Sequence, residues 1–436
     1  MASSKLMNYI DKTRGYPNDF DSLSFALALE IINEIGKCDS NYNPLYELKT
    51  LSLVYGTSVS KVDLINQITL VLGEEIGQYL NLCLKTLDDV MISNLINAVN
   101  NNEERLIDSK EDYIELCNHL YSGYGTSQFD ITTPKSLNTL MSKLLDLKSG
   151  ESIYDCTSGV GTTILSAANE TNTIYSQDIN KQVMIKQELI YKLLKYSNVT
   201  LSTDNSLLNP MLEEGGVDKA VCNSPFMFKM MEEPKELVSK IDDTVYSTNR
   251  ESDIYFYNLV SKVARKKAVF VAPSGLSFKQ NKIAVAFKEW LCKSNYLEAV
   301  IQLPTGLFSP YTNVSTVLFV INKEKKDSNI MMIDISDSKF IIKEKRTVVI
   351  NPDNMDELVK MINSKLEILS VSKLITIDDL TGEWNLTPSR FIEVEVDEES
   401  TVDIQSLMNE RSKLLNEFKK QNNLVNDYIK KLKGVS

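Results

Sequence analysis

The sequence holds very little histidine and no closely paired cysteines. Its single histidine is His119, which excludes metal sites built on several histidines and disfavours Ser-His-Asp and Cys-His catalysis. The six cysteines stand far apart and form no Cys-x-x-Cys pair, so neither a zinc ribbon nor a redox pair is indicated. We expect no metal site, and cysteines that are reduced and mostly buried.

Long apolar runs and an excess of positive charge are also missing. No apolar run approaches the roughly 18 residues of a membrane-spanning helix, and the N-terminal residues form neither a signal segment nor a myristoylation site. We therefore expect a soluble, cytoplasmic protein without a membrane partner. Lys and Arg number 47 against 59 Asp and Glu, a net charge of −12. Because DNA affinity depends on Lys and Arg at phosphates, the chain alone should bind DNA weakly.

The chain does contain enough apolar residues, 43% of 436, for a normal core, and its length allows two or three domains. Residues 1–120 carry helical-period patterns, such as Phe25–Ile35, and predict a helical N-terminal domain. From about residue 150, short apolar runs alternate with helix-length segments. This alternation predicts an α/β fold with a parallel, doubly wound sheet, whose ligands bind beyond the carboxyl ends of the strands.

The expected elements can be placed by residue number. The predicted strands are Ser152–Asp155, Thr173–Asp178, Val199–Ser202, Lys219–Asn223, Ala268–Ala272, Ala299–Leu303 and Thr316–Asn322. The predicted helices between them are Thr163–Ala168, Lys181–Lys195, Asp253–Lys266 and Ala284–Lys293. Residues 331–398 are expected to form a mixed α/β appendage, with a strand at Ile330–Ile335 and a helix around Asp356–Ser370.

The C-terminal segment, residues 399–436, is predicted to form one last helix over about 403–433. Its apolar residues fall near the a and d positions of a heptad: Ile404, Leu407, Leu414, Phe418, Val425, Tyr428 and Leu432. A lone helix must bury such a seam, either on its own chain or against a partner. Both possibilities are equally open from the sequence.

A glycine-rich loop follows the first predicted strand, which ends at Asp155. Gly159 and Gly161 in this loop let the backbone approach a ligand closely, and the helix that follows offers free N–H groups. A dinucleotide fingerprint would need glycine or alanine at position 164. Because Ile164 stands there, an NAD site is disfavoured, and a simple tight turn is the alternative.

Carboxylates follow the next two strands. Asp178 ends the second strand, about 20 residues after Asp155, where an acidic residue suits the binding of ribose hydroxyls. Its alternative role is a helix N-cap. Asp204 follows the third strand, where it could accept a hydrogen bond from an adenine amine or simply belong to a polar turn.

The fourth strand leads into Asn223-Ser224-Pro225-Phe226. Together with Asp155, Gly159 and Gly161, this segment resembles the S-adenosylmethionine-dependent amino-methyltransferases, whose motifs read D-P-x-x-G-x-G and N-P-P-F or N-P-P-Y. Three further segments match in the expected order: Gln128–Pro134 as Q-F-x-T-P, Val269–Leu276 as P-x-G-x-L, and Leu297–Phe308 as L-E-A-V-I-x-L-P-x-G-x-F. The ordered set is similar to the methylation (modification) subunit of type I restriction–modification systems, over roughly residues 20–325.

The resemblance implies a Rossmann-like S-adenosylmethionine-dependent methyltransferase sheet in residues 121–330, with transfer of a methyl group to adenine N6 in DNA. Asn223 and the Ser224 carbonyl would accept hydrogen bonds from the amine, and Phe226 would stack on a base flipped out of the duplex, next to Pro225. The resemblance also implies which residues surround S-adenosylmethionine. Its methionine end would lie beside Phe129, Thr133 and Pro134 and would be held by Asp155, Thr157, Gly159 and Gly161. Asp178 would bind the ribose and Asp204 the adenine.

The resemblance also implies partners, and the departures from it leave alternatives. The partners would be DNA, a specificity subunit, a second copy of the chain and, as a further candidate, a restriction subunit. Cys156 and Ser224 replace prolines of the family motifs, which leaves open a catalytically weakened scaffold that holds DNA or a partner. A third alternative is a methyltransferase for protein glutamine or RNA, which the helical N-terminal region disfavours.

Overall fold

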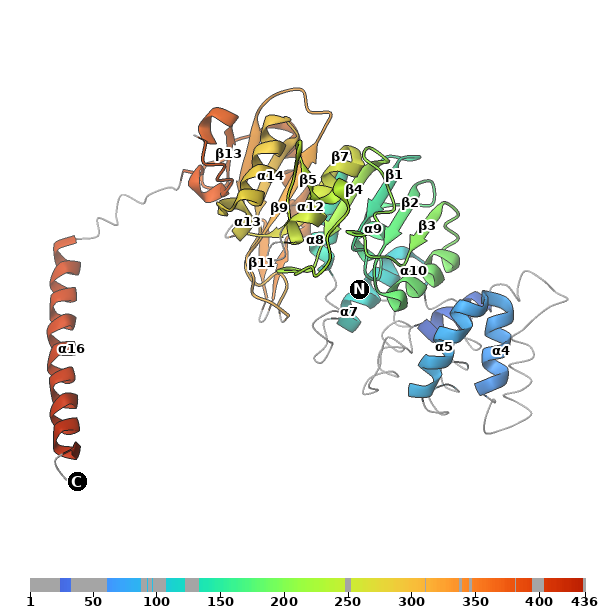
Figure 1. Cartoon of the computed structure of the whole chain (residues 1–436), viewed down its shortest axis with the longest axis horizontal. Coiled ribbons are helices and arrows are strands. Elements are labelled where there is room, and N and C mark those ends of the chain that lie inside the picture. The colour runs from blue at the N-terminus through green and yellow to red at the C-terminus, as the bar shows by residue number, and fades with distance from the viewer. Residues whose placement is uncertain are drawn as a thin grey trace. The chain divides into compact units, whose positions relative to one another are not determined.

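The sequence folds around one large sheet, which we describe from a computed structural model. The structure describes residues 24–32, 61–87, 92, 96, 107–121, 133–247, 252–309, 311–336, 339–344, 347–380, 382–393 and 404–433. These residues fall into two units, Met1–Ile392 and Glu393–Ser436. The first unit contains the sheet and the second contains one long helix (Figure 1).

The central sheet has nine strands in the order β13-β10-β8-β9-β7-β4-β1-β2-β3. Their bounds are β1 Ser152–Asp155, β2 Thr173–Gln177, β3 Val199–Ser202, β4 Val217–Asn223, β7 Ala264–Pro273, β8 Leu297–Gln302, β9 Thr316–Asn322, β10 Ile330–Asp334 and β13 Ser372–Ile375. Two short hairpins lie outside it, β5 Lys240–Ile241 with β6 Thr244–Val245, and β11 Ile341–Lys343 with β12 Val348–Ile350. The predicted α/β class and strands are therefore confirmed, with shifts at some strand ends.

The sheet is mixed, and the prediction of a parallel sheet is wrong on one side. Strands β3, β2, β1, β4 and β7 are parallel neighbours, but β9 pairs antiparallel with both β7 and β8. The described residues between β8 and β9 contain no helix. Because a parallel crossover usually needs a helix and an antiparallel return does not, this connection explains the reversed direction of β9.

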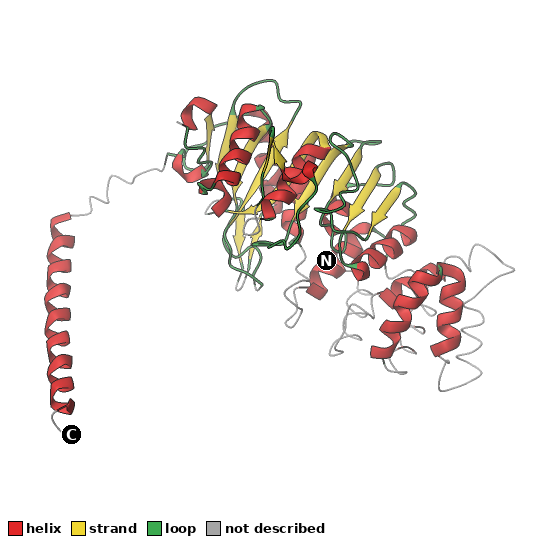
Figure 2. Ribbon diagram, viewed as in Figure 1, coloured by secondary structure: helices red, strands yellow, loops and turns green. Residues whose placement is uncertain are grey.

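Helices cover both faces of the sheet (Figure 2). On one face lie α8 Lys135–Leu145, α9 Thr162–Ala167, α10 Lys181–Leu193 and α15 Met355–Ser364, and on the other lie α11 Glu236–Ser239, α12 Asp253–Val263 and α14 Lys282–Lys293. Strand side chains alternate between the two cores: Val269 and Val271 join the first, and Phe270 joins the second. Phe270 stacks between Tyr257 and Phe319, with ring centroids 4.8 and 5.0 Å away.

Several predicted boundaries differ from the structure; for example, the helix expected around Asp356–Ser370 ends at Ser364. The helix expected over Asp253–Lys266 ends at Val263, because Ala264 already begins the ten-residue strand β7. In the segment expected as an appendage, β10 pairs parallel with β8, and β13 pairs antiparallel with β10. These two strands therefore extend the main sheet. Elsewhere in the chain, a short helix, α13 Gly275–Phe278, follows β7.

The described part of the N-terminal region is helical. It comprises residues 24–32, α4 Lys61–Leu72, α5 Glu74–Thr86 and α7 Lys110–Tyr121. Helix α7 contacts the glycine-rich loop directly, because the Tyr113 hydroxyl donates to the Val160 carbonyl at 2.8 Å. The Lys110 ammonium donates to the Ala168 carbonyl, at the end of α9, at 2.7 Å. Helix α7 is thus hydrogen-bonded both to the loop that follows β1 and to the end of α9.

The second unit contains α16, Ile404–Lys433, close to the predicted range. Among its described side chains, Leu414 is 61% exposed, Phe418 66% and Val425 53%. None of the described helices is both long enough and apolar enough to span a membrane. The five cysteines in the described residues are buried, and none forms a disulfide. Cys38 lies outside the described residues.

Candidate active site

The carboxyl ends of four neighbouring strands bring the predicted site residues to one edge of the sheet. In the β4-β1-β2-β3 block, Asp155 pairs in register with Val221 on one side and Ser176 on the other, and Gln177 pairs with Ser202. The residues that follow these strands are therefore neighbours. Such an edge is where ligands of α/β sheets bind.

Asp155 is a deeply buried carboxyl group. Its side chain is 2% exposed, and its Oδ1 accepts a hydrogen bond from the Thr157 N–H at 3.0 Å. Burial raises the pKa of Asp155 to about 7, and the nearby charge of Asp178 adds to this effect. Cys156, which replaces the family's proline, is also buried, so burial raises the pKa of its thiol well above the ordinary value. Asp155 is thus poised to change charge near neutral pH.

The glycine-rich loop adopts backbone conformations that glycine permits. Gly159 and Gly161 have φ angles of 52° and 82°. Gln187 of α10 fixes the loop through two hydrogen bonds: its Nε2 donates to the Gly159 carbonyl at 2.6 Å and to Ser158 Oγ at 2.8 Å. A Cβ at Gly161 would lie 3.0 Å from Gln187 Oε1, whereas a Cβ at Gly159 would meet nothing within 4 Å. The Gly159 side of the loop therefore faces open space.

Asp178 binds the same loop and is not the helix cap. Its Oδ2 accepts from the Gly159 N–H at 2.9 Å, and its Oδ1 accepts from the Asn180 N–H at 2.8 Å. The N-cap of α10 is Asn180, whose side chain accepts from the Gln182 N–H. A carboxylate at the end of β2, bound to the glycine-rich loop, is a group of the type that accepts hydrogen bonds from ribose hydroxyls.

Asp204 is exposed beyond the end of β3. Its Oδ2 lies 3.3 Å from the Ser202 hydroxyl, which donates to it. The adjacent Asn205 accepts from the Leu207 N–H and closes a polar turn. The carboxylate thus stands at the rim of the edge formed by β1, β2 and β3.

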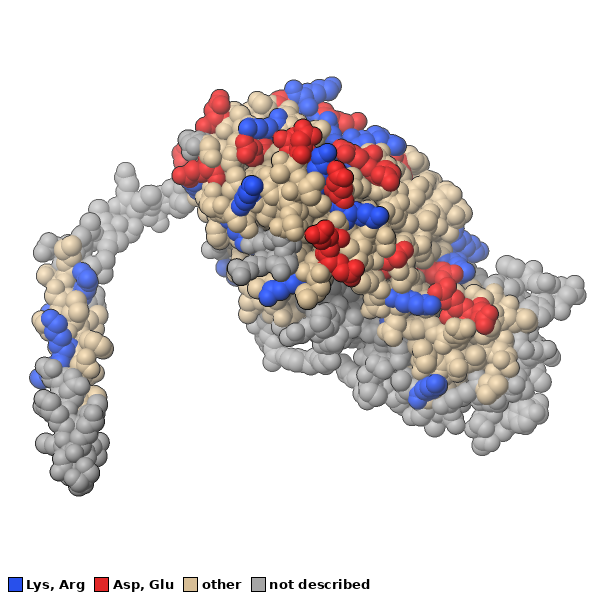
Figure 3. Space-filling model, in the orientation of Figure 1, with Lys and Arg blue, Asp and Glu red and all other residues tan. Residues whose placement is uncertain are grey.

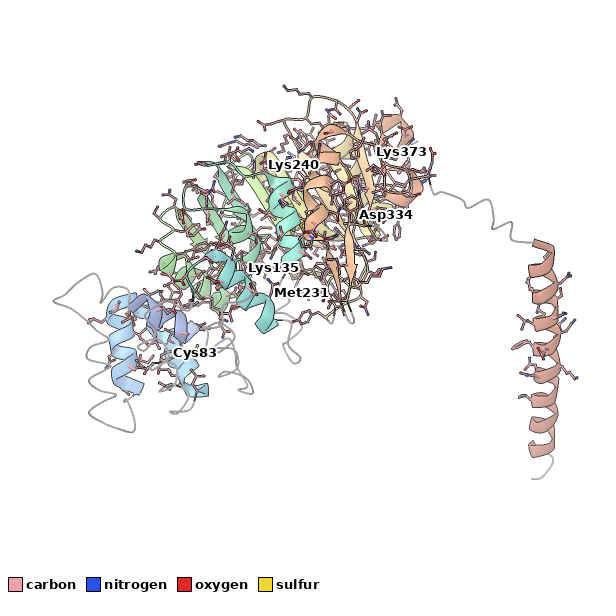
Figure 4. All side chains as sticks on the ribbon, turned by 180° about the vertical axis from the view of Figure 1, so that it is seen from behind. Cys83, Lys135, Met231, Lys240, Asp334 and Lys373 are labelled. Atoms are coloured by element: carbon pink, nitrogen blue, oxygen red, sulfur yellow. The ribbon has the colours of Figure 1, made fainter. Side chains whose placement is uncertain are left out.

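Asn223, at the end of β4, is joined to the start of α8. Its Nδ2 donates to Thr133 Oγ1 at 2.8 Å. Pro134 directly precedes Lys135, the first residue of α8, which Figure 4 labels. Thr133 is buried and Asn223 is half-buried. The segment expected beside the cofactor thus also contacts the predicted catalytic asparagine. Phe129 lies outside the described residues.

The rest of the predicted catalytic segment alternates in exposure. Ser224 is buried, Pro225 is exposed and Phe226 is half-buried. The ring of Phe226 packs edge-to-face on Phe308, with centroids 5.7 Å apart and planes at 82°. Thr157, in the glycine-rich loop, places its hydroxyl 3.5 Å from the sulfur of Cys222, so the two segments lie side by side.

Sequence reasoning missed several buried polar residues behind this edge. Asn138 in α8 and Thr163 in α9 hydrogen-bond to each other at 2.8 Å, and Gln187 supports the glycine loop. The one signal for Asn138 was its place between the apolar residues Leu137 and Leu140, on the buried side of what the structure shows to be helix α8. Nothing in the sequence distinguished Thr163 or Gln187 from ordinary helix residues.

The basic residues of β7 lie paired at the opposite end of the sheet. Arg265 and Lys266 contact Asp218 at 2.8 and 3.0 Å, and Lys267 contacts Glu298 at 3.3 Å. Positive and negative side chains are intermingled over the visible face (Figure 3). These basic side chains therefore form ion pairs with the chain's own carboxylates.

A family comparison agrees with this arrangement. The family model described as N-6 DNA Methylase matches residues 116–400, more than half of the chain. The chain belongs to the N-6 DNA methylase family. The match covers the sheet and the edge that carries Asp155, Asp178 and Asn223. The family expected from the sequence motifs is therefore confirmed.

Individual relatives of this N-6 DNA methylase are methylase subunits. It is 24% identical over 388 residues to the type I restriction enzyme MpnII methylase subunit of Mycoplasma pneumoniae, covering 82% of this chain and 70% of that one. It is 22% identical over 370 residues to the type I restriction enzyme MjaVIII methylase subunit of Methanocaldococcus jannaschii, covering 79% and 64%. The chain thus spans about two thirds of the length of these relatives.

A solved structure shares the fold. The type I restriction-modification system methyltransferase subunit from Streptococcus thermophilus aligns with a TM-score of 0.67 and 16% sequence identity, covering 89% of this chain and 98% of that one. This likeness confirms the expected Rossmann-like methyltransferase sheet.

Proposed function

We propose that this N-6 DNA methylase transfers a methyl group from S-adenosylmethionine to adenine N6 in DNA, as the modification subunit of a type I restriction–modification complex. The observation that carries the proposal is the meeting of Asn223-Ser224-Pro225-Phe226 with the Asp155–Gly161 loop at one sheet edge, within the matched family region. Because its substrate is DNA, we place the protein in the cytoplasm of its cell.

The residues at the edge fit S-adenosylmethionine. Gly159 faces open space where any other side chain would stand, which leaves room for the methionine end, beside Thr133 and Pro134. Asp155 is a carboxyl group with a pKa of about 7, suited to an ammonium group. Asp178, a carboxylate bound to the same loop, suits the ribose hydroxyls, and the exposed Asp204 suits the adenine amine. When bound, the cofactor supplies an electrophilic methyl group.

The chain's own residues would activate the substrate by positioning it. The adenine amine is a weak nucleophile because its lone pair is delocalised into the ring. Asn223 Oδ1 and the Ser224 carbonyl would accept its two hydrogens, which favours a localised lone pair. Asn223 Nδ2 is already bound to Thr133, so its Oδ1 is the atom left for the amine. This step needs neither a strong base nor a metal.

Phe226 would stack on the flipped base. Its edge contact with Phe308 holds the Phe226 ring from one side, which leaves a face for the adenine. A duplex base must leave the helix to reach such a site. Pro225 is exposed beside it, at the rim.

The test is methylation of DNA by the chain in complex. We would co-express the chain with the genes that neighbour it, incubate the purified complex with genomic DNA and S-adenosylmethionine, and map N6-methyladenine. We expect methylation at one recurring sequence, and its loss in Asn223→Ala, with S-adenosylmethionine binding retained in calorimetry. Absence of methyladenine with the wild-type complex would sink the proposal.

The alternative is a scaffold with weakened chemistry, which the buried Cys156 and Ser224 at the two proline positions favour. A scaffold would hold DNA in the complex but bind S-adenosylmethionine poorly. Calorimetry separates the two functions, because clear micromolar binding of S-adenosylmethionine contradicts the scaffold.

For the active subunit we propose a specificity subunit and a second copy of the chain as partners, with a restriction subunit as a further candidate.

A further inference from the structure

Behind Asn223 lies a chain of hydrogen-bonded side chains that connects β4 with α8 and α9. Asn138 is completely buried, and Thr133 and Thr163 are each 6% exposed. Asn138 Nδ2 donates to the Thr133 carbonyl at 3.1 Å and to Thr162 Oγ1 at 3.3 Å. Both protons of this amide nitrogen are thereby used, so Asn138 Oδ1 can only face Thr163.

The bonds of Thr163 and Thr133 continue this chain from Asn138 to Asn223, each with a defined donor and acceptor. The Thr163 hydroxyl donates to Asn138 Oδ1 at 2.8 Å and lies 3.2 Å from Thr133 Oγ1. The Thr163 hydroxyl is also the donor in its longer contact with Thr133 Oγ1, so the Thr133 oxygen accepts on this side. Thr133 Oγ1 is then an acceptor toward Asn223, whose Nδ2 approaches it at 2.8 Å.

We propose that Asn138 and Thr163 are positioning residues that set which way the Asn223 amide faces, so that its Oδ1 points toward the substrate amine. The proposal rests on the proposed function, since the orientation matters only for a substrate that donates. An amide turned by half a rotation would present NH₂ to the adenine amine. Two donors would then face each other, and the activation by Asn223 would be lost.

The sharpest variant is Thr163→Val, which keeps the shape of the side chain and removes its hydroxyl. Thr133 then loses one of the two donors that fix its hydroxyl, Thr163 and Asn223. The Thr133 hydroxyl can then turn and donate its proton to Asn223 Oδ1, which turns the amide around. We expect kcat for adenine methylation by the co-expressed complex to fall about tenfold, the factor that one ordinary hydrogen bond corresponds to. The KM for DNA and the affinity for S-adenosylmethionine should stay within about twofold of the wild type.

Thr163→Ser is the matched control, because it retains the hydroxyl and should restore most of kcat. An unchanged kcat in Thr163→Val would overturn the inference. So would a loss of kcat that Thr163→Ser does not rescue, or one that runs parallel to weaker S-adenosylmethionine binding or to a lower unfolding temperature. Each of these results leaves methylation by the wild type, and with it the proposed function, intact.

A second measurement is independent of activity. The side-chain NH₂ signals of Asn223 can be assigned in chain labelled with ¹⁵N-asparagine by their absence from Asn223→Asp. We expect Thr163→Val to shift both proton signals and Thr163→Ser to leave them near their wild-type positions. Unshifted signals in Thr163→Val would refute the hydrogen-bond chain, even if the wild-type complex failed to methylate DNA.

Discussion

The Tyr113 hydroxyl donates to the carbonyl of Val160 at 2.8 Å, so helix α7 holds the glycine-rich loop that follows β1. Both side chains are buried. A bond from the helical region to this loop couples the region to the site where we expect S-adenosylmethionine to bind.

We therefore predict that Tyr113→Phe weakens S-adenosylmethionine binding. The variant keeps the ring and leaves the Val160 carbonyl without this donor, which costs about 1 kcal/mol, or a factor of about five in affinity. Isothermal calorimetry measures the change. Tyr196→Phe is the control, because its hydroxyl bonds the Ala168 carbonyl, away from the loop, at 3.4 Å. Equal affinities for Tyr113→Phe and the wild type would contradict the coupling.

The pKa of Asp155, about 7 in the folded chain against about 4 in the unfolded chain, predicts a pH dependence. A carboxyl group whose pKa is raised by folding stabilises the fold in its protonated form. This contribution is complete below about pH 4 and is lost as pH rises through about 7. Asp155→Asn should therefore reduce the pH dependence of the free energy of unfolding, which is measured in urea between pH 5 and 8.

The same group predicts that S-adenosylmethionine binds more tightly at pH 8 than at pH 6. An ionised Asp155 attracts an ammonium group and a protonated one does not. In Asp155→Asn this difference should disappear. If the variant keeps the wild-type pH profile of binding, Asp155 is not the group that titrates.

Alanine at the two loop glycines should have different effects. Gly161→Ala places a Cβ 3.0 Å from Gln187 Oε1 at a φ of 82°, so we expect a loss of unfolding free energy of about 1–3 kcal/mol. The Cβ of Gly159→Ala meets nothing within 4 Å among the described residues and would occupy space that we assign to the ligand. It should reduce S-adenosylmethionine affinity more than Gly161→Ala does, at a smaller cost in stability.

Thermal unfolding and calorimetry on both variants test this contrast. Gly275→Ala is the neutral control, since a Cβ there has open space and Gly275 has no positive φ. Should Gly159→Ala bind S-adenosylmethionine like the wild type, the ligand does not lie against this side of the loop.

Helix α16 should be needed for assembly with a partner and dispensable for the fold of the first unit. Leu414 and Phe418 are exposed on it, and α16 belongs to a separate unit. Deleting residues 403–436, or introducing Leu414→Glu with Phe418→Glu, should abolish co-purification with a specificity subunit. The unfolding temperature of the first unit should stay unchanged, and Lys419→Glu, beside the seam, should assemble normally. Unimpaired assembly of the deleted chain would refute this role.

Much of the fold was predictable because it depends on local pattern. Strands β1, β3 and β9 begin and end at the predicted residues. β1 and β9 lie inside the sheet, where buried apolar runs fit, whereas β3 is a partly exposed outer strand. The direction of β9 was not predictable from its own residues. It depends on the connection from β8, whose described residues contain no helix, and so on the crossover as a whole.

The candidate site was predictable only in part, for a related reason. Asp155 and Asn223 end strands and Asp178 directly follows one, so chain topology brings them together whatever their side chains contact. Asn138 and Thr163 lie within helices, and their contact depends on how α8 and α9 pack on each other. Sequence spacing carries no information about that packing.

One outer strand of the sheet, β13, is poorly suited to pairing with another chain. β13 is a four-residue strand that carries Lys373, and short edge strands with lysine resist pairing with another chain. A chain cut at residue 330 would lose both β10 and β13 and would expose the unpaired backbone of β8, whose side chains are almost all buried. Such a fragment would keep Asp155 and Asn223 but would expose a strand with unpaired backbone groups. We therefore expect the fragment to aggregate under conditions in which a chain ending after residue 392 does not.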